Sequence, residues 1–276
     1  MIQLATGRWA GFGIAGNFAG HLEQAGEIKD FASLSKAGAG PKGMFPFHLS
    51  IDGHFLAVDP LSSSDLALPE GAAVQCEPEV ALACELHYGP DHSVKLKPLA
   101  FAAFDDASIR REGAPKISFK KNWGPGSKGL SSRWVKLPHG LDRGSPLDSW
   151  RVASFLGRDG VWRAYGIDSP VAGYTLYGPA LATWIEEKLT SQADEGPLEN
   201  LPSLLARAGY PELAVISIGA TRYTDLGETT YLQPGDRFAV AIYDPQVIDA
   251  QELPALCARG ESGEGLSLLV RLAQRI

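Results

Sequence analysis

Two glutamates two positions apart are the residues of this sequence best placed to do chemistry. Glu77 and Glu79 lie in the run VQCEPEVALACEL (residues 74–86), whose alternation of apolar and polar residues is typical of a β-strand. On a strand both side chains share one face and start about 7 Å apart. Carboxylates at that spacing can converge on a divalent cation, with about 2 to 2.5 Å to each oxygen. The spacing therefore predicts a metal-binding strand.

The residues around the pair argue against the alternative, which is a strand with one solvated face. Ala81 and Ala83 continue the acidic face where an exposed strand usually carries larger polar residues, so we expect something to cover it. Pro78 cannot donate to a ladder, which predicts an edge or a bulge at this point.

A third acid follows in the run FDDASIRR (residues 104–111), after an apolar stretch. Asp106 taken alone is typical of a helix N-cap, and together with Glu77 and Glu79 it is a candidate third ligand. Two carboxylates about 4 Å apart repel by about 4 kcal/mol at an effective dielectric constant near 20, so a converged trio needs a cation or protonation. Three hard oxygen donors favour Mg²⁺, with Mn²⁺ or Ca²⁺ as substitutes, over Zn²⁺.

Composition bounds the class of protein. The chain has 276 residues, of which 45% are hydrophobic, enough for a sizeable core. The formal charge of −7 and the lack of a Lys/Arg stripe argue against nucleic acid as a partner. We find neither an apolar run that could span a membrane nor a secretion signal, so we expect a cytoplasmic protein that does not bind membranes. Cys76 and Cys84 on the apolar face of the strand predict buried free thiols, which suit a reducing compartment.

The chain is broken into short pieces by 31 glycines and 19 prolines, which predicts a strand-rich fold with few helices. Residues 150–167 predict a hairpin with its turn at 157–160. Helices are expected from Pro179, over 202–208 and over 265–275. The preferred division is a small N-terminal section with a possible lid (residues 1–55) and a main β-rich domain (residues 56–276).

Four blocks in collinear order resemble the fumarylacetoacetate hydrolase superfamily. They are GNFAGH (residues 16–21), the Glu77-Pro78-Glu79 triplet with DDASIR (residues 105–110), VISIGATR (residues 215–222) and YLQPGDRFAV (residues 231–240). The resemblance runs from about residue 10 to residue 245. It implies an α+β, mostly β fold, a mixed β-roll or sandwich with a few peripheral helices. It also implies a divalent metal, commonly a homodimer, and chemistry on small 2-keto or β-diketo acids.

The resemblance also implies roles for single residues. Metal ligands would be Glu77, Glu79 and Asp106; catalytic residues would be His21, Glu23 and Lys121; and substrate-binding residues would be Arg110, Gly219 and Thr221. Relatives commonly carry a glutamate three residues after the histidine, where this chain has Gln24, so a glutamate from elsewhere, or none, stays open. Lys116, Lys120 and Lys128 are alternatives to Lys121.

The expected function is that of a metal-dependent hydrolase cleaving a carbon–carbon bond in a small β-diketo or 2-keto acid, such as an acylpyruvate. His21 would accept a proton from water, and Lys121 would stabilise the developing enolate. The first alternative is decarboxylation, hydration or isomerisation through an enolate at the same site. The second is a non-catalytic protein that binds a small anion on this scaffold.

Overall fold

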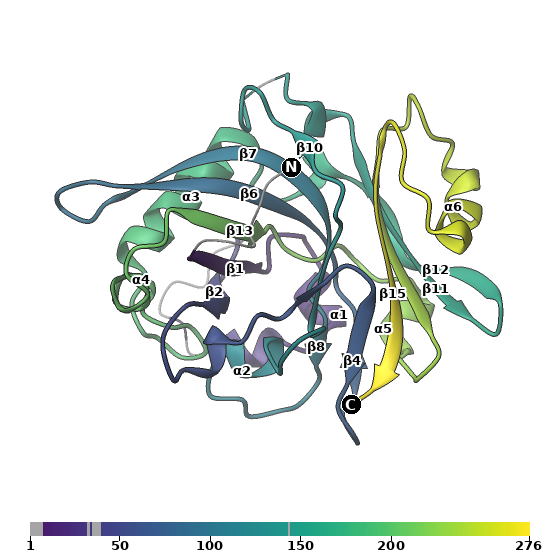
Figure 1. Cartoon of the computed structure of the whole chain (residues 1–276), viewed down its shortest axis with the longest axis horizontal. Helices are drawn as coiled ribbons and strands as arrows, with labels where there is room; N and C mark the ends of the chain where they lie inside the picture. Colours follow the sequence, from purple (N-terminus) through teal and green to yellow (C-terminus); the bar gives the residue numbers. More distant parts are fainter. Residues whose placement is uncertain (1–7, 32–33, 35–39, 143) are drawn as a thin grey trace.

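A computed structural model describes residues 8–31, 34, 40–142 and 144–276. Strands dominate it and curl into two main sheets that lie side by side (Figure 1). The prediction of a mostly β fold with a few peripheral helices is confirmed. The strands are β1 (Trp9–Ala15), β2 (Gly43–Leu49), β3 (Leu61–Ser62), β4 (Asp65–Leu68), β5 (Val74–Gln75), β6 (Pro78–Tyr88), β7 (Val94–Asp105), β8 (Ser108–Ile109), β9 (Lys128–Leu130), β10 (Val135–Lys136), β11 (Arg151–Arg158), β12 (Val161–Pro170), β13 (Leu213–Ser217), β14 (Arg237–Tyr243) and β15 (Leu266–Arg275).

The larger sheet has the strand order β2-β1-β13-β6-β7-β9-β3, with β10 paired to β7. Its longest pair is the antiparallel β6–β7 hairpin, whose register places Pro78 opposite Asp105. Strand β13 lies on the other side of β6 and pairs in parallel with β1. The N-terminal strand and a strand from late in the chain therefore meet beside the two glutamates.

The second sheet has the order β12-β11-β14-β15-β4. Its β11–β12 hairpin confirms the one predicted over residues 150–167, with Asp159 and Gly160 at positive φ in the turn. The helix predicted over residues 265–275 is wrong, because this segment is strand β15, paired on both sides. A short apolar run fits a buried strand as well as a helix. Here the backbone pairing with β14 on one side and β4 on the other selects the strand.

The helices are short and peripheral. They are α1 (His21–Gln24), α2 (Ser118–Lys121), α3 (Gly178–Ser191), α4 (Leu201–Arg207), α5 (Asp225–Thr229) and α6 (Leu253–Arg259), with 3₁₀ turns η1 (Ile28–Phe31), η2 (Phe55–Ala57), η3 (Pro146–Asp148), η4 (Val171–Gly173) and η5 (Ala250–Glu252). The helices predicted from Pro179 and over 202–208 are confirmed as α3 and α4.

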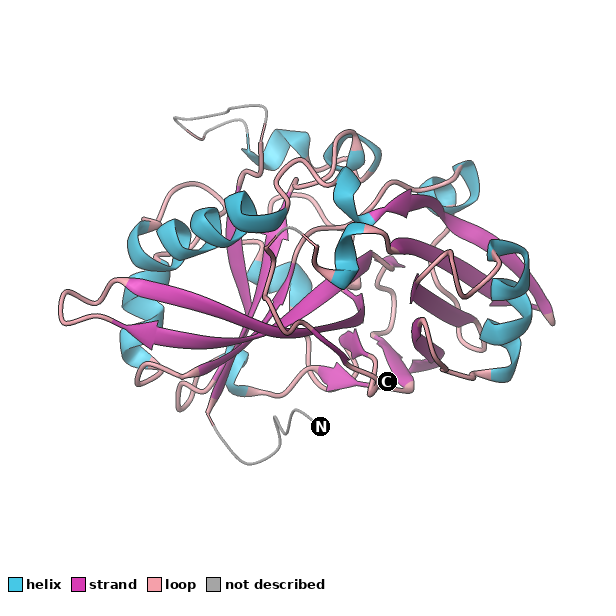
Figure 2. Cartoon of the chain, turned by 90° about the horizontal axis from the view of Figure 1, so that it is seen from above, coloured by secondary structure: helices cyan, strands magenta, loops and turns pink. Residues whose placement is uncertain are grey.

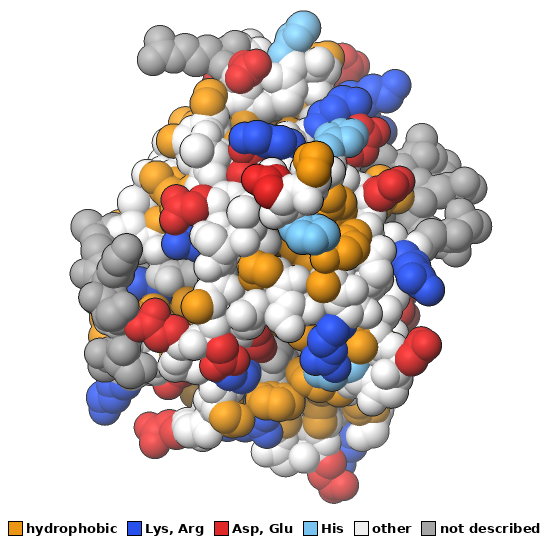
Figure 3. Space-filling model, turned by 90° about the vertical axis from the view of Figure 1, so that its left-hand side faces the viewer, with side chains coloured by type: hydrophobic (Ala, Val, Ile, Leu, Met, Phe, Trp, Pro, Cys, Tyr) orange, Lys and Arg blue, Asp and Glu red, His pale blue; other side chains and the backbone are white. Residues whose placement is uncertain are grey.

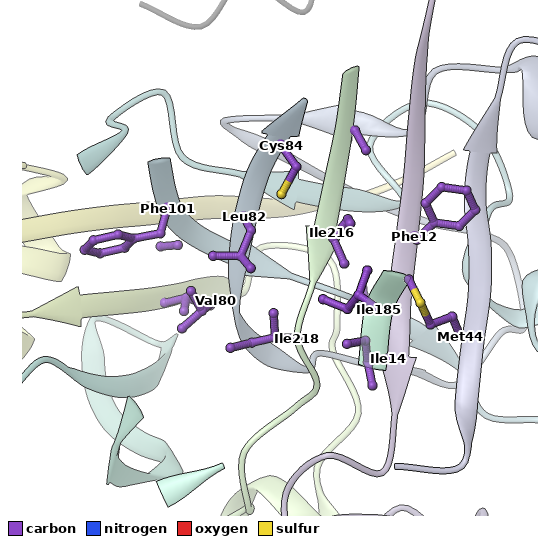
Figure 4. Close-up of a cluster of buried hydrophobic side chains, with 14 of the residues drawn as sticks. Phe12, Ile14, Met44, Val80, Leu82, Cys84, Phe101, Ile185, Ile216 and Ile218 are labelled. Carbon is purple, nitrogen blue, oxygen red and sulfur yellow. The ribbon is translucent and has the colours of Figure 1, made fainter. Parts of the chain in front are cut away.

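Helix α3 lies across the larger sheet, as the view from above shows (Figure 2). Leu181, Ile185 and Leu189 recur four residues apart and are buried, so one apolar stripe faces the strands. Ile185 lies among Ile14 and Ile216 in the core close-up (Figure 4). This packing covers one face of β1, β13 and β6.

The other face of the larger sheet is also covered, as Ala81 and Ala83 predicted. Both alanines are buried, and Ala81 packs in a second cluster with Phe47 and Phe104. Cys76 and Cys84 are free and buried, which confirms the thiols expected on the apolar face, and Cys257 in α6 is free and buried as well. The acidic strand therefore lies inside the protein and not at its surface.

The first 55 residues contribute β1 and β2 to the larger sheet. Residues 1–7, 32–33 and 35–39 of that section lie outside the described residues. The division at residue 55 and the lid stay predictions. Among the described helices, none combines the length and the apolar character needed to cross a membrane.

Candidate metal centre

Glu77, Glu79 and Asp106 come together in the interior. One carboxylate oxygen from each lies within 4.8 Å of the others, and all three side chains are buried. Glu79 belongs to β6, Glu77 precedes it directly, and Asp106 follows β7. Because the β6–β7 ladder ends at the pair Pro78–Asp105, and the Asp106 N–H donates to the Glu77 carbonyl (3.0 Å), the two strand ends bring the acids together.

The position of Pro78 differs from the expectation of an edge or a bulge. Strand β6 is interior, between β13 and β7, and Pro78 is its first residue. A proline tolerates this place because a first strand residue need not donate to the ladder. No helix begins at Asp106, so the N-cap alternative does not hold.

The turn after β13 closes the site beside Glu79. Gly219 has a φ of 109°, and its N–H donates to Glu79 Oε2 at 2.8 Å. A Cβ at this position would lie 3.0 Å from the Cβ of Asn17, whose amide donates to the Ile218 carbonyl (2.9 Å). Two constraints therefore favour glycine at position 219: the positive φ angle and the close approach of the loop that carries Asn17.

Three cations surround the acids. Lys121 Nζ bridges Glu77 Oε2 (2.8 Å) and Asp106 Oδ2 (2.6 Å). Lys128 Nζ lies 3.1 Å from Asp106 Oδ1 and also donates to the Ala107 carbonyl. Arg110 Nη2 lies 2.7 Å from Glu77 Oε1. All three cationic side chains are largely buried, so their charges act on the carboxylates with little screening by water.

The environment separates the pKa values of the acids. Burial tends to raise the pKa of Glu77, but Lys121 and Arg110 outweigh it and hold that pKa well below its ordinary value. Burial, Asp106 and Glu77 together raise the pKa of Glu79 well above its ordinary value. Burial also raises the pKa of Asp106, against the opposing lysines, and lowers the pKa of Lys128 to about 8. Without a further cation, the charge of Glu79 is therefore the least favourable of the three.

His21 lies at the same point, and its predicted partner does not. Its Nε2 is 4.0 Å from Glu77 Oε2, and neither ring nitrogen has a hydrogen-bond partner among the described residues. Burial lowers the pKa of His21 against the pull of Glu77, so the ring is neutral near pH 7 and can accept a proton. Glu23 is exposed, and the Gln24 amide donates to the Tyr223 carbonyl and to Glu228. The structure does not bring Glu23 to the site.

The three residues predicted to bind substrate lie around the acids. The Arg110 guanidinium is engaged by Gln75, Glu27, Tyr223 and Glu77, and the Gly219 N–H is bonded to Glu79. Thr221 is buried, and its hydroxyl has no hydrogen-bond partner within the described ranges. Of the three, Thr221 therefore has the free polar group, and the substrate-binding roles stay predictions.

Sequence reasoning missed Glu27 as a member of this site. Glu27 lines the same cavity as His21, Glu77 and Lys121, and it pairs with Arg110 (2.7 Å) and Lys120 (2.8 Å). Its position six residues after His21 fits no simple spacing rule. Its long-range pairing with Arg110 and Lys120 leaves no local signal in the sequence.

The donor set fits a hard divalent cation. It offers three carboxylates with converging oxygens and no thiol or imidazole within the trio. Although both Asp106 oxygens lie at ion-pair distance from lysines, burial and the neighbouring acids still raise the pKa of Asp106 and of Glu79. A bound divalent cation would offset this cost of placing the charges together.

The cavity at the acids is small, about 10 Å³, and its apolar wall includes Ile14, Phe45 and Ile117. A groove of about 1210 Å³ lies elsewhere, along β7, β10 and α3, and none of the three acids lines it. We place the functional site at the acids because burying converging charges is costly and such clusters are typical of functional sites, whereas a wide groove carries no such cost.

On the face shown in Figure 3, acidic and basic side chains are intermixed over the described residues.

A buried carboxylate outside the trio, that of Glu199, predicts a pH effect on stability. Burial raises the pKa of Glu199 to about 7, against the opposing effects of Ser118 and Lys116. The unfolded chain releases this proton near pH 4.5, so the unfolding free energy falls as pH rises from about 4.5 to 7, by about 3 kcal/mol. Urea unfolding at pH 5 and pH 8 should show a smaller difference in Glu199→Gln than in the wild type. An unchanged difference, matching that of the exposed control Glu187→Gln, would refute this assignment.

Comparison with known proteins gives the following matches. The profile of a family described as "Family of unknown function (DUF5718)" matches residues 27–273. A search of curated protein sequences finds no match.

Several solved structures share the fold. One described as Cg1458 with inhibitor has a TM-score of 0.57 at 17% identity, covering 98% of this chain and 77% of that one. A 5-carboxymethyl-2-hydroxymuconate delta-isomerase from Mycobacterium smegmatis has a TM-score of 0.53 at 14% identity, covering 97% and 79%. A 2-keto-3-deoxy-D-arabinonate dehydratase complexed with magnesium and 2,5-dioxopentanoate has a TM-score of 0.55 at 13% identity, covering 98% and 73%. At these identities the likeness concerns the fold, and the predicted fold type is confirmed.

Proposed function

This chain belongs to the family described as a family of unknown function (DUF5718), and we propose that it is a metal-dependent enzyme acting on a small 2-keto or β-diketo acid. We further propose that it is a divergent member of the fumarylacetoacetate hydrolase superfamily. The observation that carries the proposal is the burial of three converging carboxylates. Burying charged groups is expensive unless they are paired or bind a metal, and such clusters are typical of functional sites.

Glu77, Glu79 and Asp106 would hold the cation, with Mg²⁺ preferred and Mn²⁺ or Ca²⁺ possible. When bound, the cation supplies a Lewis acid and a template for the carboxylate and keto oxygens of a 2-keto acid. The magnesium and the dioxo acid named for the dehydratase structure support this choice by analogy of fold.

The other residues bind, orient and move protons. Lys121 and Lys128 present two ammonium groups beside Asp106, where they would stabilise negative charge that develops on the substrate oxygen. The neutral ring of His21 would accept a proton from water. Ile14, Phe45 and Ile117 would exclude bulk water, which strengthens each of these electrostatic interactions.

Hydrolysis of a carbon–carbon bond is the reaction we propose first, because His21 is a neutral base beside the acids. A specific observation favours the second candidate, which is decarboxylation, hydration or isomerisation through an enolate. Glu23 is exposed and Gln24 bonds elsewhere, so neither forms the dyad with His21 that would activate water. The protein would act as a homodimer in the cytoplasm, without nucleic acid or membrane partners.

Purified protein, stripped of metal and reloaded with Mg²⁺ or Mn²⁺, should be assayed against a panel of acylpyruvates and short oxo-dicarboxylic acids. We expect metal-dependent loss of ultraviolet absorbance. Product analysis by NMR separates two carboxylic acids (hydrolysis) from carbon dioxide release (decarboxylation) and from a product of unchanged mass (isomerisation). Bound metal with neither turnover nor deuterium exchange from D₂O would favour the non-catalytic anion-binding protein and would refute the enzyme.

His21→Asn tests the proton-transfer role. The asparagine keeps the size of the polar group but cannot accept a proton at neutral pH, so we expect kcat to fall by about 10² to 10⁴. Mn²⁺ affinity should stay within about twofold, because His21 is not a ligand of the trio. A variant with wild-type kcat would exclude His21 as the base.

A further inference from the structure

A line of alternating charges runs from the acidic trio to Asp30 in the η1 turn. Each neighbouring pair lies between 2.6 and 3.1 Å apart, and the signs alternate without a break. In order, the members are Lys128, Asp106, Lys121, Glu77, Arg110, Glu27, Lys120 and Asp30. Only Asp30, at the far end, has a side chain as much as 30% accessible.

Arg110 is the link between the ligand Glu77 and the rest of this line. Its Nη2 lies 2.7 Å from Glu77 Oε1 and its Nη1 donates to Glu27 Oε1 at 2.7 Å. Its Nε donates to Gln75 (2.7 Å), and its Nη2 also donates to the Tyr223 hydroxyl (3.0 Å). A guanidinium fixed from four directions has one orientation, and that orientation determines where it meets the Glu77 carboxylate.

Glu27 and Glu77 both form ion pairs with Arg110, so the positive charge of the guanidinium is divided between two carboxylates. If Glu27 were neutral, Glu77 would be the single anionic partner of the guanidinium. The guanidinium would then attract Glu77 more strongly and neutralise more of the charge of its carboxylate. A ligand neutralised in this way binds a divalent cation less tightly. Lys120 holds Glu27 in place from the other side, at 2.8 Å.

We propose that Glu27 is a positioning residue for the metal centre. By pairing with Arg110, it orients the guanidinium and limits how much of the Glu77 charge is neutralised, and it thereby sets the affinity for a divalent cation. This inference rests on the proposed function of the acidic trio. It concerns a side chain outside the trio. It also gives a role to the buried Glu27–Lys120 ion pair, which the proposed reaction does not use.

The test is a double-mutant cycle on the metal affinity of the intact chain. Mn²⁺ binding to metal-stripped protein is measured by calorimetry and by the electron paramagnetic resonance signal of free Mn²⁺. Glu27→Gln keeps the shape of the side chain and removes its charge. We expect the Mn²⁺ Kd to rise about tenfold, within the range of coupling between residues in one ion-pair network. In an Arg110→Met background the same change should alter the Kd by less than about twofold, because the connecting group is gone.

Controls separate positioning from loss of folding. Asp236→Asn removes a buried carboxylate from another arginine pair, with Arg158 (2.6 Å), in the second sheet, and should leave the Mn²⁺ Kd unchanged. Arg110→Lys, which keeps the charge without the planar fork, provides a second background if Arg110→Met does not fold. Circular dichroism verifies that each variant is folded before titration.

Two results would overturn the inference and leave the proposed function standing. One is a wild-type Kd in Glu27→Gln. The other is a rise in Kd that is equal with and without Arg110, which would make Glu27 a distant charge and not a positioning residue. A wild-type chain that binds no Mn²⁺ would instead overturn the metal centre and this inference together.

Discussion

Glu79→Gln is expected to abolish measurable binding of Mg²⁺ and Mn²⁺, with a loss of affinity on the order of a hundredfold or more, and to abolish turnover. The substitution leaves two carboxylates, both already paired with lysine or arginine. In the metal-free protein the variant should be at least as stable as the wild type, because burial and the neighbouring acids raise the pKa of Glu79 and make its charge unfavourable. Thermal unfolding with and without Mn²⁺ measures both effects in one experiment.

The matched control is Glu85→Gln, on the same strand and the same expected face. Glu85 is partly exposed and pairs with Lys97 at 3.0 Å, away from the trio. It should keep the wild-type Mn²⁺ affinity and the Mn²⁺-induced rise in Tm. If Glu79→Gln keeps that rise as well, Glu79 is not a ligand.

Arg271→Met is expected to lower the free energy of unfolding by about 3 to 5 kcal/mol. Arg271 is fully buried on β15, pairs with Asp105 on β7, and donates to the carbonyls of Asp65 and Gly126, so one side chain joins the two sheets. Removing it leaves the buried Asp105 charge without its cation. Asp105 Oδ1 also accepts the Glu77 N–H (3.1 Å), so the loss reaches the backbone of a metal ligand.

Urea unfolding of Arg271→Met beside Arg275→Met gives this measurement with a control on the same strand, because Arg275 is exposed. We expect the control to stay within about 0.5 kcal/mol of the wild type. A loss below about 1 kcal/mol in Arg271→Met would mean that the sheets do not depend on this ion pair.

The sequence was informative where chemistry depends on local spacing. Glu77 and Glu79 share a face because strand side chains alternate, and the length of the β6–β7 hairpin brings Asp106 beside them. Helix α3 carries its apolar residues at a clear helical period and was predictable for the same reason. These features need few contacts from distant parts of the chain.

Features that depend on distant contacts were not predictable. Strand β15 has an apolar run that suits two elements, and only its neighbours β14 and β4 select the strand. Glu27 reaches the site through Arg110, 83 positions later in the chain. The lysine alternatives differ only in space, where Lys121 and Lys128 both contact Asp106, Lys120 contacts Glu27 and Asp30, and Lys116 contacts Asp194.

The most direct test of the metal centre is the anomalous difference map of a crystal grown with Mn²⁺. We expect one strong peak, about 2 to 2.5 Å from an oxygen of each of Glu77, Glu79 and Asp106. A map without a peak at this point, from crystals in which the three side chains are ordered, would contradict it.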